Sequence, residues 1–245
     1  SATADNYPPP AAKGIDWLLT QVQEDGSIGT PSGGMRVRTT AKAANVLQCA
    51  ARYSKGRRVP AMAEPGLWLQ RQRQEGGLWS VQGGAGATDW LGSTLSLEAL
   101  TWPPTDLREP EVLQQLWQLG EGHPPHGAIA GAAFLATWYL RNQEVRRRCC
   151  ELLARTPPSL QTPPAQRDYM AWYFTTQAMQ FEAEAQWTPW WRALVHTATS
   201  LQRQDGAHAG SWDPDDLRGR ECGRVYATAA MLLGLEVVWR KQYRD

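Results

Sequence analysis

A pattern of residues around Trp17 recurs around Trp68 without any insertion or deletion, and every matched pair lies 51 positions apart. The matched pairs are Trp17 with Trp68, Leu18 with Leu69, Gln21 with Gln72, and Gly26 with Gly77. A looser third copy runs from Leu201 through Gln202 to Gly206, with Trp212 after it. Repeats of this length are typical of helix pairs that bury their apolar faces only by stacking on one another. The chain is therefore predicted to be an array of helical hairpins.

Each residue type that recurs in the repeat has a physical role at the end of a helix. Gln is expected in the last turn, where backbone carbonyls lack a partner within the helix. Gly ends the helix, and a tryptophan that follows it, such as Trp79 or Trp212, covers the joint. This role accounts for part of an unusual aromatic composition, with 13 Trp against 3 Phe.

Two kinds of helix alternate along the chain. Helices with one apolar stripe are expected near 10–23, 60–74, 110–119, 143–155 and 188–204. More uniformly apolar helices are expected near 37–53, 88–101, 127–141, 168–181 and 223–240. Strand patterns are almost absent, so the fold class is all-α. Helices that are buried on one face and helices that are buried all round would form two concentric layers.

Composition and charge narrow the classes of function. A net charge of +1 argues against nucleic acid or an anionic membrane surface as the main partner. The longest uncharged run, at 127–140, has 14 residues, fewer than the roughly 20 that span a bilayer. It and the run at 225–235 are expected to be core helices covered on all sides, and no transmembrane segment is expected. The four cysteines, with Cys149 next to Cys150, match neither a disulfide scaffold nor a metal site.

These repeats resemble the QW repeats of the terpenoid cyclase and protein prenyltransferase superfamily, which includes the squalene–hopene cyclases. The resemblance implies an α/α toroid with about five to six helical hairpins. A single toroid domain would span 10–245, and 1–9 would be a linker or a trimmed terminus. The stretch at 168–239 is similar to bacterial prenyltransferase/squalene oxidase repeat proteins. Those proteins are often parts of larger secreted or membrane-anchored chains, which implies the cell envelope or periplasm.

Class II cyclases of this superfamily protonate an isoprenoid with a D-x-D-D motif, and this chain contains Asp213, Asp215 and Asp216 in that spacing. These three are the candidate catalytic residues. The alternative is a solvated turn, because Asp and Pro are common turn residues. The turn is favoured because the motif lies in a connector, Pro214 is its variable residue, and Leu217 follows it.

Prenyltransferase β subunits hold zinc through Asp, Cys and His on inner helices. In this chain Ala227 occupies the place of the histidine, and the stretch from Thr88 through Asp89 has no cysteine. Neither a metal site nor a cofactor is therefore expected. His123 and His126 are more typical of a loop that enters a helix than of a metal site.

The amino ends of the inner helices would meet at one rim if those helices run in the same direction. Helix amino ends favour anions, so arginines there would form a receptor for an acidic group. The alternative for Asp89 and Asp168 is a role as helix N-caps or as arginine partners. The predicted rim residues are Arg36, Arg38, Asp89, His126, Arg167, Asp168, Arg220 and Arg224.

Large aromatic side chains are expected just below this rim. Indole and phenol groups there would either line a cavity or fill the centre of the ring, and the sequence leaves both alternatives open. These residues are Trp90, Tyr169, Trp172, Tyr173 and Tyr226.

The leading functional hypothesis is a non-catalytic toroid that binds an apolar or anionic small molecule, or a protein, at one face of the inner ring. The first alternative is a cyclase-like or prenyltransferase-like enzyme acting on an isoprenoid. The second is a structural domain of a larger cell-envelope protein. The proposed ligand-binding residues are Arg38, Asp89, Trp90, Asp168, Tyr169, Trp172, Tyr173, Arg224 and Tyr226.

Overall fold

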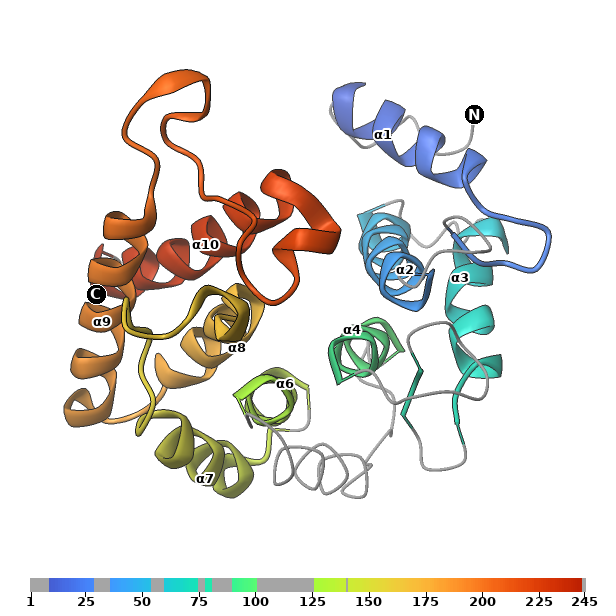
Figure 1. Ribbon diagram of the computed structural model, residues 1–245. Coiled ribbons are helices and arrows are strands. Elements are labelled where there is room, and N and C mark those ends of the chain that lie inside the picture. The colour runs from blue at the N-terminus through green and yellow to red at the C-terminus, as the bar shows by residue number, and fades with distance from the viewer. Residues whose placement is uncertain are drawn as a thin grey trace. The chain divides into compact units, whose positions relative to one another are not determined.

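The computed structural model describes residues 9–28, 36–53, 60–74, 78–80, 90–100, 126–139 and 141–243. In these parts the chain forms helices, two short 3-10 turns and two isolated bridges, Val22 with Ile28 and Gln202 with Trp212 (Figure 1). No β-sheet forms within them, which confirms the all-α class. The residues gather into two compact units, Ser1–Gln115 and Leu116–Asp245, which are described separately below.

The first unit contains two layers of helices. Its helices are α1 (Pro9–Thr20), α2 (Arg36–Tyr53), α3 (Pro60–Arg71) and α4 (Trp90–Leu100). Helix α2 packs along α4, while α3 packs on α2 and also contacts α4. Helix α1 contacts α2. Helices α2 and α4, which were expected to be uniformly apolar, therefore share one layer, and α3 covers it.

The second unit repeats this arrangement. Its helices are α6 (His126–Trp138), α7 (Gln143–Leu153), α8 (Tyr169–Met179), α9 (Glu184–Leu201) and α10 (Gly219–Tyr243), with 3-10 turns at Pro164–Gln166 and Gly206–His208. Helix α8 packs between α6 and α10. Helix α7 covers α6 and α8, and α9 covers α8 and α10. The predicted alternation of helix types is thus a layered packing in this unit, and the helix expected at 110–119 lies outside the described residues.

Burial follows the two predicted kinds of helix. In α6 every residue from 127 to 136 is buried, as expected for an apolar helix with neighbours on all sides. In α7 only Cys149, Cys150 and Leu153 are buried, and its arginine-rich face is solvated. The prediction of a core helix in this run is therefore confirmed for 127–136, while Trp138 at the end of α6 is 44% exposed.

Helix α10 differs from its prediction. The run at 225–235 was expected to be covered on all sides, but Val225 is 85% exposed and Leu232 is 53% exposed. Ala229 and Trp239 are exposed on the same face. The reason is that, among the described helices of the second unit, the main neighbours of α10 are α8 and α9. An apolar sequence shows that a helix is suited to burial, but it does not show which neighbours bury it.

The segment Cys222–Gln242 is, within the described chain, the one helix long and apolar enough to cross a membrane. Only 33% of the window tested is buried inside the structure. Length and composition alone are weak evidence, because a core helix of a water-exposed domain satisfies the same test. The described residues therefore contain no clear transmembrane segment.

The turn after each outer helix has the same backbone hydrogen bonds in all three repeats. The Gln23 amide donates to the Ser27 carbonyl at 2.8 Å, and the Gln74 amide donates to the Leu78 carbonyl at 2.8 Å. The third repeat uses the Arg203 amide and the Ser211 carbonyl at 2.9 Å. The three turns identified from the sequence spacing are therefore each closed by the same kind of backbone hydrogen bond.

A hydroxyl group on the next inner helix holds each turn. The N–H groups of Ile28, Trp79 and Trp212 donate to the side-chain oxygens of Thr40 at 2.9 Å, Ser93 at 3.0 Å and Thr228 at 3.2 Å, respectively. Thr40 and Ser93 also donate back to the carbonyls of the same residues. Helices α2, α4 and α10 are thus each bound to the repeat turn that precedes them in the chain.

Tryptophan closes two of these joints. The indole N–H of Trp79 donates to the Leu69 carbonyl at 2.7 Å, and that of Trp212 donates to the Ala198 carbonyl at 2.8 Å. Both acceptors lie in the last turn of an outer helix, and each also accepts a backbone amide, from Gln72 and Gln202 respectively. The predicted role of these indoles at helix ends is confirmed.

Trp17 does not share that role, because its side chain is 63% exposed. Its counterpart Trp68 is 2% exposed and donates from its indole N–H to Asp25 of the preceding repeat at 3.2 Å. Although Trp17 belongs to the repeat, it therefore does not cover a helix end as Trp79 and Trp212 do.

Candidate functional site

The predicted site residues of the second unit converge where the amino ends of α8 and α10 meet. Asp168 directly precedes α8, and the D-x-D-D segment directly precedes α10. The Leu217 amide donates to the Arg167 carbonyl at 2.7 Å, which fixes one loop against the other. The structure therefore places both candidate sets, catalytic and ligand-binding, in one polar cluster.

Asp168 acts as a helix cap and as an arginine partner. Its Oδ1 accepts a hydrogen bond from the Ala171 amide at 3.0 Å, which satisfies one orphan donor of α8. Its Oδ2 lies 3.6 Å from Nε of Arg218, and both side chains are buried. This is the alternative that the sequence had left open beside an anion-binding role.

Asp215 is held from two sides. The phenol of Tyr169 donates to its Oδ1 at 3.1 Å, and Nη1 of Arg167 lies 3.5 Å from its Oδ2. Arg167 also donates to the backbone carbonyls of Thr162 at 3.0 Å and Leu160 at 3.2 Å. Burial, followed by the negative charge of Asp215, raises the pKa of Tyr169 above its usual value. Tyr169 therefore remains a neutral donor to the carboxylate.

Asp216 is the most deeply buried carboxyl of the cluster, with 0% exposure. Burial and the nearby charge of Asp168 raise its pKa to about 6, although the amides of Arg218, Tyr169 and Gly219 act in the opposite direction. Neither carboxylate oxygen completes a hydrogen bond of standard geometry to a described residue. A Cβ atom at Gly219 would collide with this carboxyl and with the backbone of Pro214, so glycine is required there.

Asp213 lies between two arginines, and its side chain is as exposed as that of Asp215. Its Oδ1 pairs with Nη2 of Arg224 at 2.6 Å, and its Oδ2 lies 3.5 Å from Nη1 of Arg203. Arg224 also donates to Oγ of Ser211 at 3.1 Å and to the carbonyl of Trp212 at 3.4 Å. Arg224 thereby joins the start of α10 to the third repeat turn.

Carboxylates and guanidinium groups are paired throughout the cluster. Asp213, Asp215 and Asp168 each face an arginine, respectively Arg224, Arg167 and Arg218. A general acid that protonates an alkene must present its proton to the substrate. Both carboxylate oxygens of Asp215 are engaged, one by Tyr169 and the other by Arg167, and Asp216 has no exposed surface. Two arginines of the predicted anion receptor, Arg167 and Arg224, therefore already pair with carboxylates of the same unit.

The predicted aromatic residues of the second unit pack into its core. Tyr169 is 1% exposed and Trp172 is 8% exposed, with ring centroids 5.2 Å apart. The Tyr173 ring packs on Phe134 and Phe174. The hydroxyl of Tyr226 is buried without a hydrogen bond to a described residue, and burial raises the pKa of this phenol. Tyr169 and Trp172 therefore belong to the core of this unit, whereas Tyr173 and Tyr226 are half-buried.

The remaining predicted residues belong to the first unit or lie outside the description. Arg38 is partly buried on α2. Asp89 and the side chains of Trp90 and His126 are outside the described residues. Arg220 is exposed in the first turn of α10.

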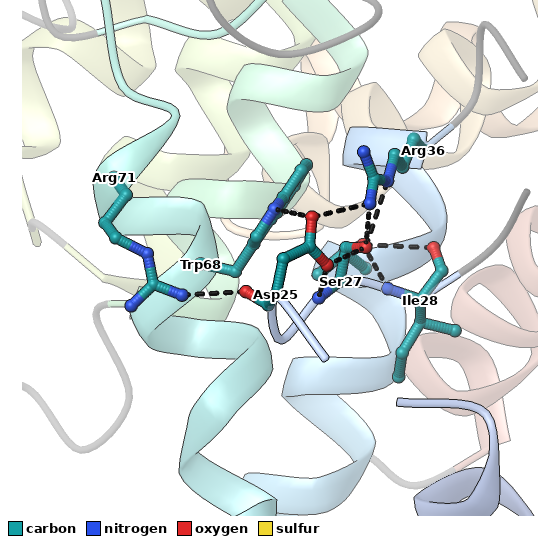
Figure 2. A network of polar contacts seen from close by, with 7 residues as sticks. Asp25, Ser27, Ile28, Arg36, Trp68 and Arg71 are labelled. Carbon is teal, nitrogen blue, oxygen red and sulfur yellow. Dashed lines mark hydrogen bonds and ion pairs between the residues drawn. The ribbon is translucent and has the colours of Figure 1, made fainter. Parts of the chain in front are cut away.

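A second polar network lies in the first unit, and it was not predicted from the sequence (Figure 2). Nη2 of Arg36 pairs with Oδ2 of Asp25 at 2.6 Å, and its Nε donates to Oγ of Ser27 at 3.0 Å. Trp68 donates to the same Asp25 oxygen, and Arg71 donates to the Asp25 carbonyl at 2.8 Å. Burial raises the pKa of Asp25, but the hydrogen bonds from Ser27 and the charge of Arg36 outweigh it and hold the pKa below its usual value.

The two networks share their parts. We call Asp25, Ser27, Arg36 and Thr40 the first latch, and Ser211, Asp213, Arg224 and Thr228 the second latch. In both, an arginine in the inner helix pairs with an aspartate, donates to a serine of the turn, and lies four residues before the threonine that holds the turn. The sequence signal that could have revealed them is the repeated Arg-x-x-x-Thr at 36–40 and 224–228.

Other chemical groups in the described residues are structural. No set of three or more His, Cys, Asp or Glu side chains in the described parts is arranged to hold a metal ion. Cys149 and Cys150 are free, buried thiols, and burial raises the pKa of Cys149 to about 12. Both therefore remain protonated and pack as small apolar residues.

Comparisons of the chain with models of protein families, with curated proteins and with solved structures returned no match. The arguments about function therefore depend on the geometry of the chain itself.

Proposed function

We propose that the chain is a non-catalytic binding domain that takes a protein partner on the exposed face of α10. The toroidal arrangement expected from the repeats is part of this proposal. It is supported by the alternation of helix types and by the two layers within each unit. The proposed surface begins at Arg224, one of the predicted ligand-binding residues, and continues along the helix.

The observation that carries the proposal is the apolar stripe on α10, which we define as Val225, Ala229 and Leu232. These residues lie on one face because they are spaced by four and three positions. Val225 is 85% exposed and Leu232 is 53% exposed, while Trp239 continues the same face with 58% exposure. Contiguous apolar surface with a polar edge is typical of protein interaction sites. Asp213 and Arg224 supply that polar edge at the amino end.

The enzyme alternative lacks a comparable surface in the described residues. Asp213 pairs with Arg224, Asp215 contacts Arg167 and Tyr169, and Asp216 is buried. Each of these carboxyls can therefore be explained as stabilising the loop between α9 and α10. The aromatic side chains beside them fill the core of the second unit. Cyclisation needs both a presented proton and a space for the substrate.

Photo-crosslinking tests this proposal. The photoreactive p-benzoylphenylalanine is placed at Val225 of the full chain, and a matched variant carries it at Glu144, an exposed residue of α7. After irradiation in the cells that make the protein, we expect a protein adduct at Val225 that is absent at Glu144. An adduct with the mass of a lipid or isoprenoid, or equal labelling at both positions, would contradict the proposal.

A further inference from the structure

The second latch holds together the two ends of one loop, residues 214–223, which we call the flap. Arg224, directly after the flap, pairs with Asp213, directly before it, at 2.6 Å. Arg224 also donates to the Trp212 carbonyl, and the Trp212 amide donates to Thr228 at 3.2 Å. A loop whose ends are fixed to each other is an Ω-loop. The flap can therefore move without displacing the third repeat turn or the long part of α10.

The far end of the flap has a hinge. Gly223 interrupts the helical conformation of α10, with φ 80° and ψ 179°. This region of backbone conformation is accessible essentially to glycine alone. A Cβ atom at Gly223 would meet no neighbouring group within 4 Å, so the backbone there has space to rotate. The turn at 219–222 is thus joined to the rest of α10 by a flexible position.

Polar groups hold the flap on the amino end of α8. The Leu217 amide donates to the Arg167 carbonyl at 2.7 Å, but the Leu217 side chain is 53% exposed. The buried side chains among those described in the flap are Asp216 and Arg218. Segments with few buried apolar contacts open at a lower free-energy cost than the core around them. The flap is such a segment.

The contact between the flap and α8 has one carboxyl more than it has guanidinium groups. Arg218 pairs with Asp168. Arg167 pairs with Asp215. The third carboxyl, Asp216, is buried, and neither of its oxygens completes a hydrogen bond of standard geometry to a described residue. A buried carboxylate without such partners is costly, whereas the protonated carboxyl carries no charge.

Of the groups around it, Asp216 is the one expected to change charge near pH 6. Burial, followed by the negative charge of Asp168, raises the pKa of Asp216 to about 6. The phenols of Tyr169 and Tyr226 remain neutral, because burial raises the pKa of both. Besides the Asp215–Arg167 pair, the titratable and charged side chains around Asp216 are Asp168, Tyr169, Arg218, Cys222 and Tyr226.

We propose that the flap is a proton-controlled cover over the amino end of α8. It is closed while Asp216 carries a proton, and it turns outward about Gly223 when Asp216 is ionised and becomes hydrated. Opening separates Leu217 from the Arg167 carbonyl and exposes Tyr169, while α10 beyond Gly223 stays in place. Acid therefore favours the closed form, and neutral pH raises the population of the open form. The flap works independently of the proposed partner surface on α10.

Hydrogen exchange of the Leu217 amide under native conditions measures flap opening, because this amide is bonded to Arg167 only in the closed form. After division by the intrinsic exchange rate, its opening constant should rise about tenfold between pH 5 and pH 8, as a pKa change from 3.8 to about 6 requires. Asp216→Asn should abolish this rise. Asp205→Asn, at an exposed position before the flap, should retain it.

Low concentrations of urea separate flap opening from unfolding of the second unit. The opening constant of the Leu217 amide should be at least about tenfold larger than that of an amide in the middle of α8, such as Phe174. Urea should leave the Leu217 constant unchanged, because opening of the flap exposes little surface. It should raise the Phe174 constant, because that amide exchanges only when the core unfolds.

A substitution at the hinge supplies a second test that leaves Asp216 intact. Gly223→Ala places a side chain at φ 80°, and opening relieves this strain, so the Leu217 opening constant should rise at least about fivefold at both pH values. Gly210→Ala is the matched control, because Gly210 has φ 82° and free space around its Cβ but lies outside the flap. It should leave the Leu217 constant unchanged. Circular dichroism of each variant checks that helices are retained.

The proposal fails if the Leu217 amide exchanges only together with the core of α8, since the flap then does not move separately. It also fails if the corrected opening constant is equal at pH 5 and pH 8, or if Asp216→Asn retains the rise. Equal effects of Gly223→Ala and Gly210→Ala on Leu217 would contradict the hinge. If Asp216→Asn does not fold, the wild-type pH series and the hinge variant still decide.

Discussion

Asp216 gives the second unit a stability that depends on pH in a direction opposite to that of most aspartates. Its pKa in the folded chain is about 6, above the ordinary value of 3.8, because the carboxyl is buried beside Asp168. The folded state therefore binds a proton more tightly than the unfolded state does. The stabilising contribution is complete below pH 3.8 and is lost as the pH rises through about 6.

The size of the effect follows from the two pKa values. Between pH 5 and pH 8 the free energy of unfolding should fall by about 1.4 kcal/mol through this one group. Asp216→Asn removes the titration while keeping the shape of the side chain. The difference in unfolding free energy, variant minus wild type, should therefore rise by about 1.4 kcal/mol over the same interval.

Urea denaturation of both chains at pH 5 and pH 8 measures this difference. Because the chain has two units, pulsed hydrogen exchange of α8 and α10 peptides identifies the transition of the second unit. The exposed Asp205→Asn variant controls for the loss of one acidic group. A variant-minus-wild-type difference that is the same at both pH values would refute the burial of a titrating Asp216.

Two further substitutions test the joints of the fold. Trp79→Phe removes the indole donor and should destabilise the first unit by about 1 kcal/mol, because the Leu69 carbonyl keeps only its bond from the Gln72 amide. The same urea assay should show almost no change for Trp17→Phe, and equal effects would contradict the assigned roles. Gly219→Ala should destabilise the second unit by more than about 2 kcal/mol, because the new methyl group collides with the Asp216 carboxyl and the loop backbone. Gly14→Ala, with open space around its Cβ, is the matched control, and similar melting temperatures for the two variants would disprove the close packing at Gly219.

The helices could be predicted from the sequence because their signals are local. The expected segments at 37–53 and 143–155 differ from α2 and α7 by only one or two residues at their ends. The alternation of helix types also predicted which helices pack in the same layer. Hydrophobic periodicity reports the environment of each helix face, which is why this level of structure was accessible.

The exposed face of α10 could not be predicted in the same way. Its residues Val225, Ala229 and Leu232 are as apolar as those of a helix enclosed on every side. Whether a neighbour covers them depends on the helices that pack around α10, and α8 and α9 leave this face uncovered. Periodicity identifies faces that are suited to burial, and only the packing identifies those that are buried.

The site was predictable in part. An aspartate directly before an apolar helix indicates an N-cap, and Asp168 has that role. The pairing of Tyr169 with Asp215 joins residues 46 positions apart, and no local pattern encodes it. Arg218 was missed for the same reason, since its contact with Asp168 depends on how the two loops meet.

The most direct test of a binding function without catalysis is an isoprenoid turnover assay. Wild-type chain and the Asp215→Asn variant are incubated with squalene and with geranylgeranyl diphosphate, and the products are analysed by gas chromatography and mass spectrometry. We predict no cyclised or transferred product from either chain, because Asp215 is held by Tyr169 and Arg167 as a structural carboxylate. A product that forms with the wild type and disappears in the Asp215→Asn variant would contradict the proposed function.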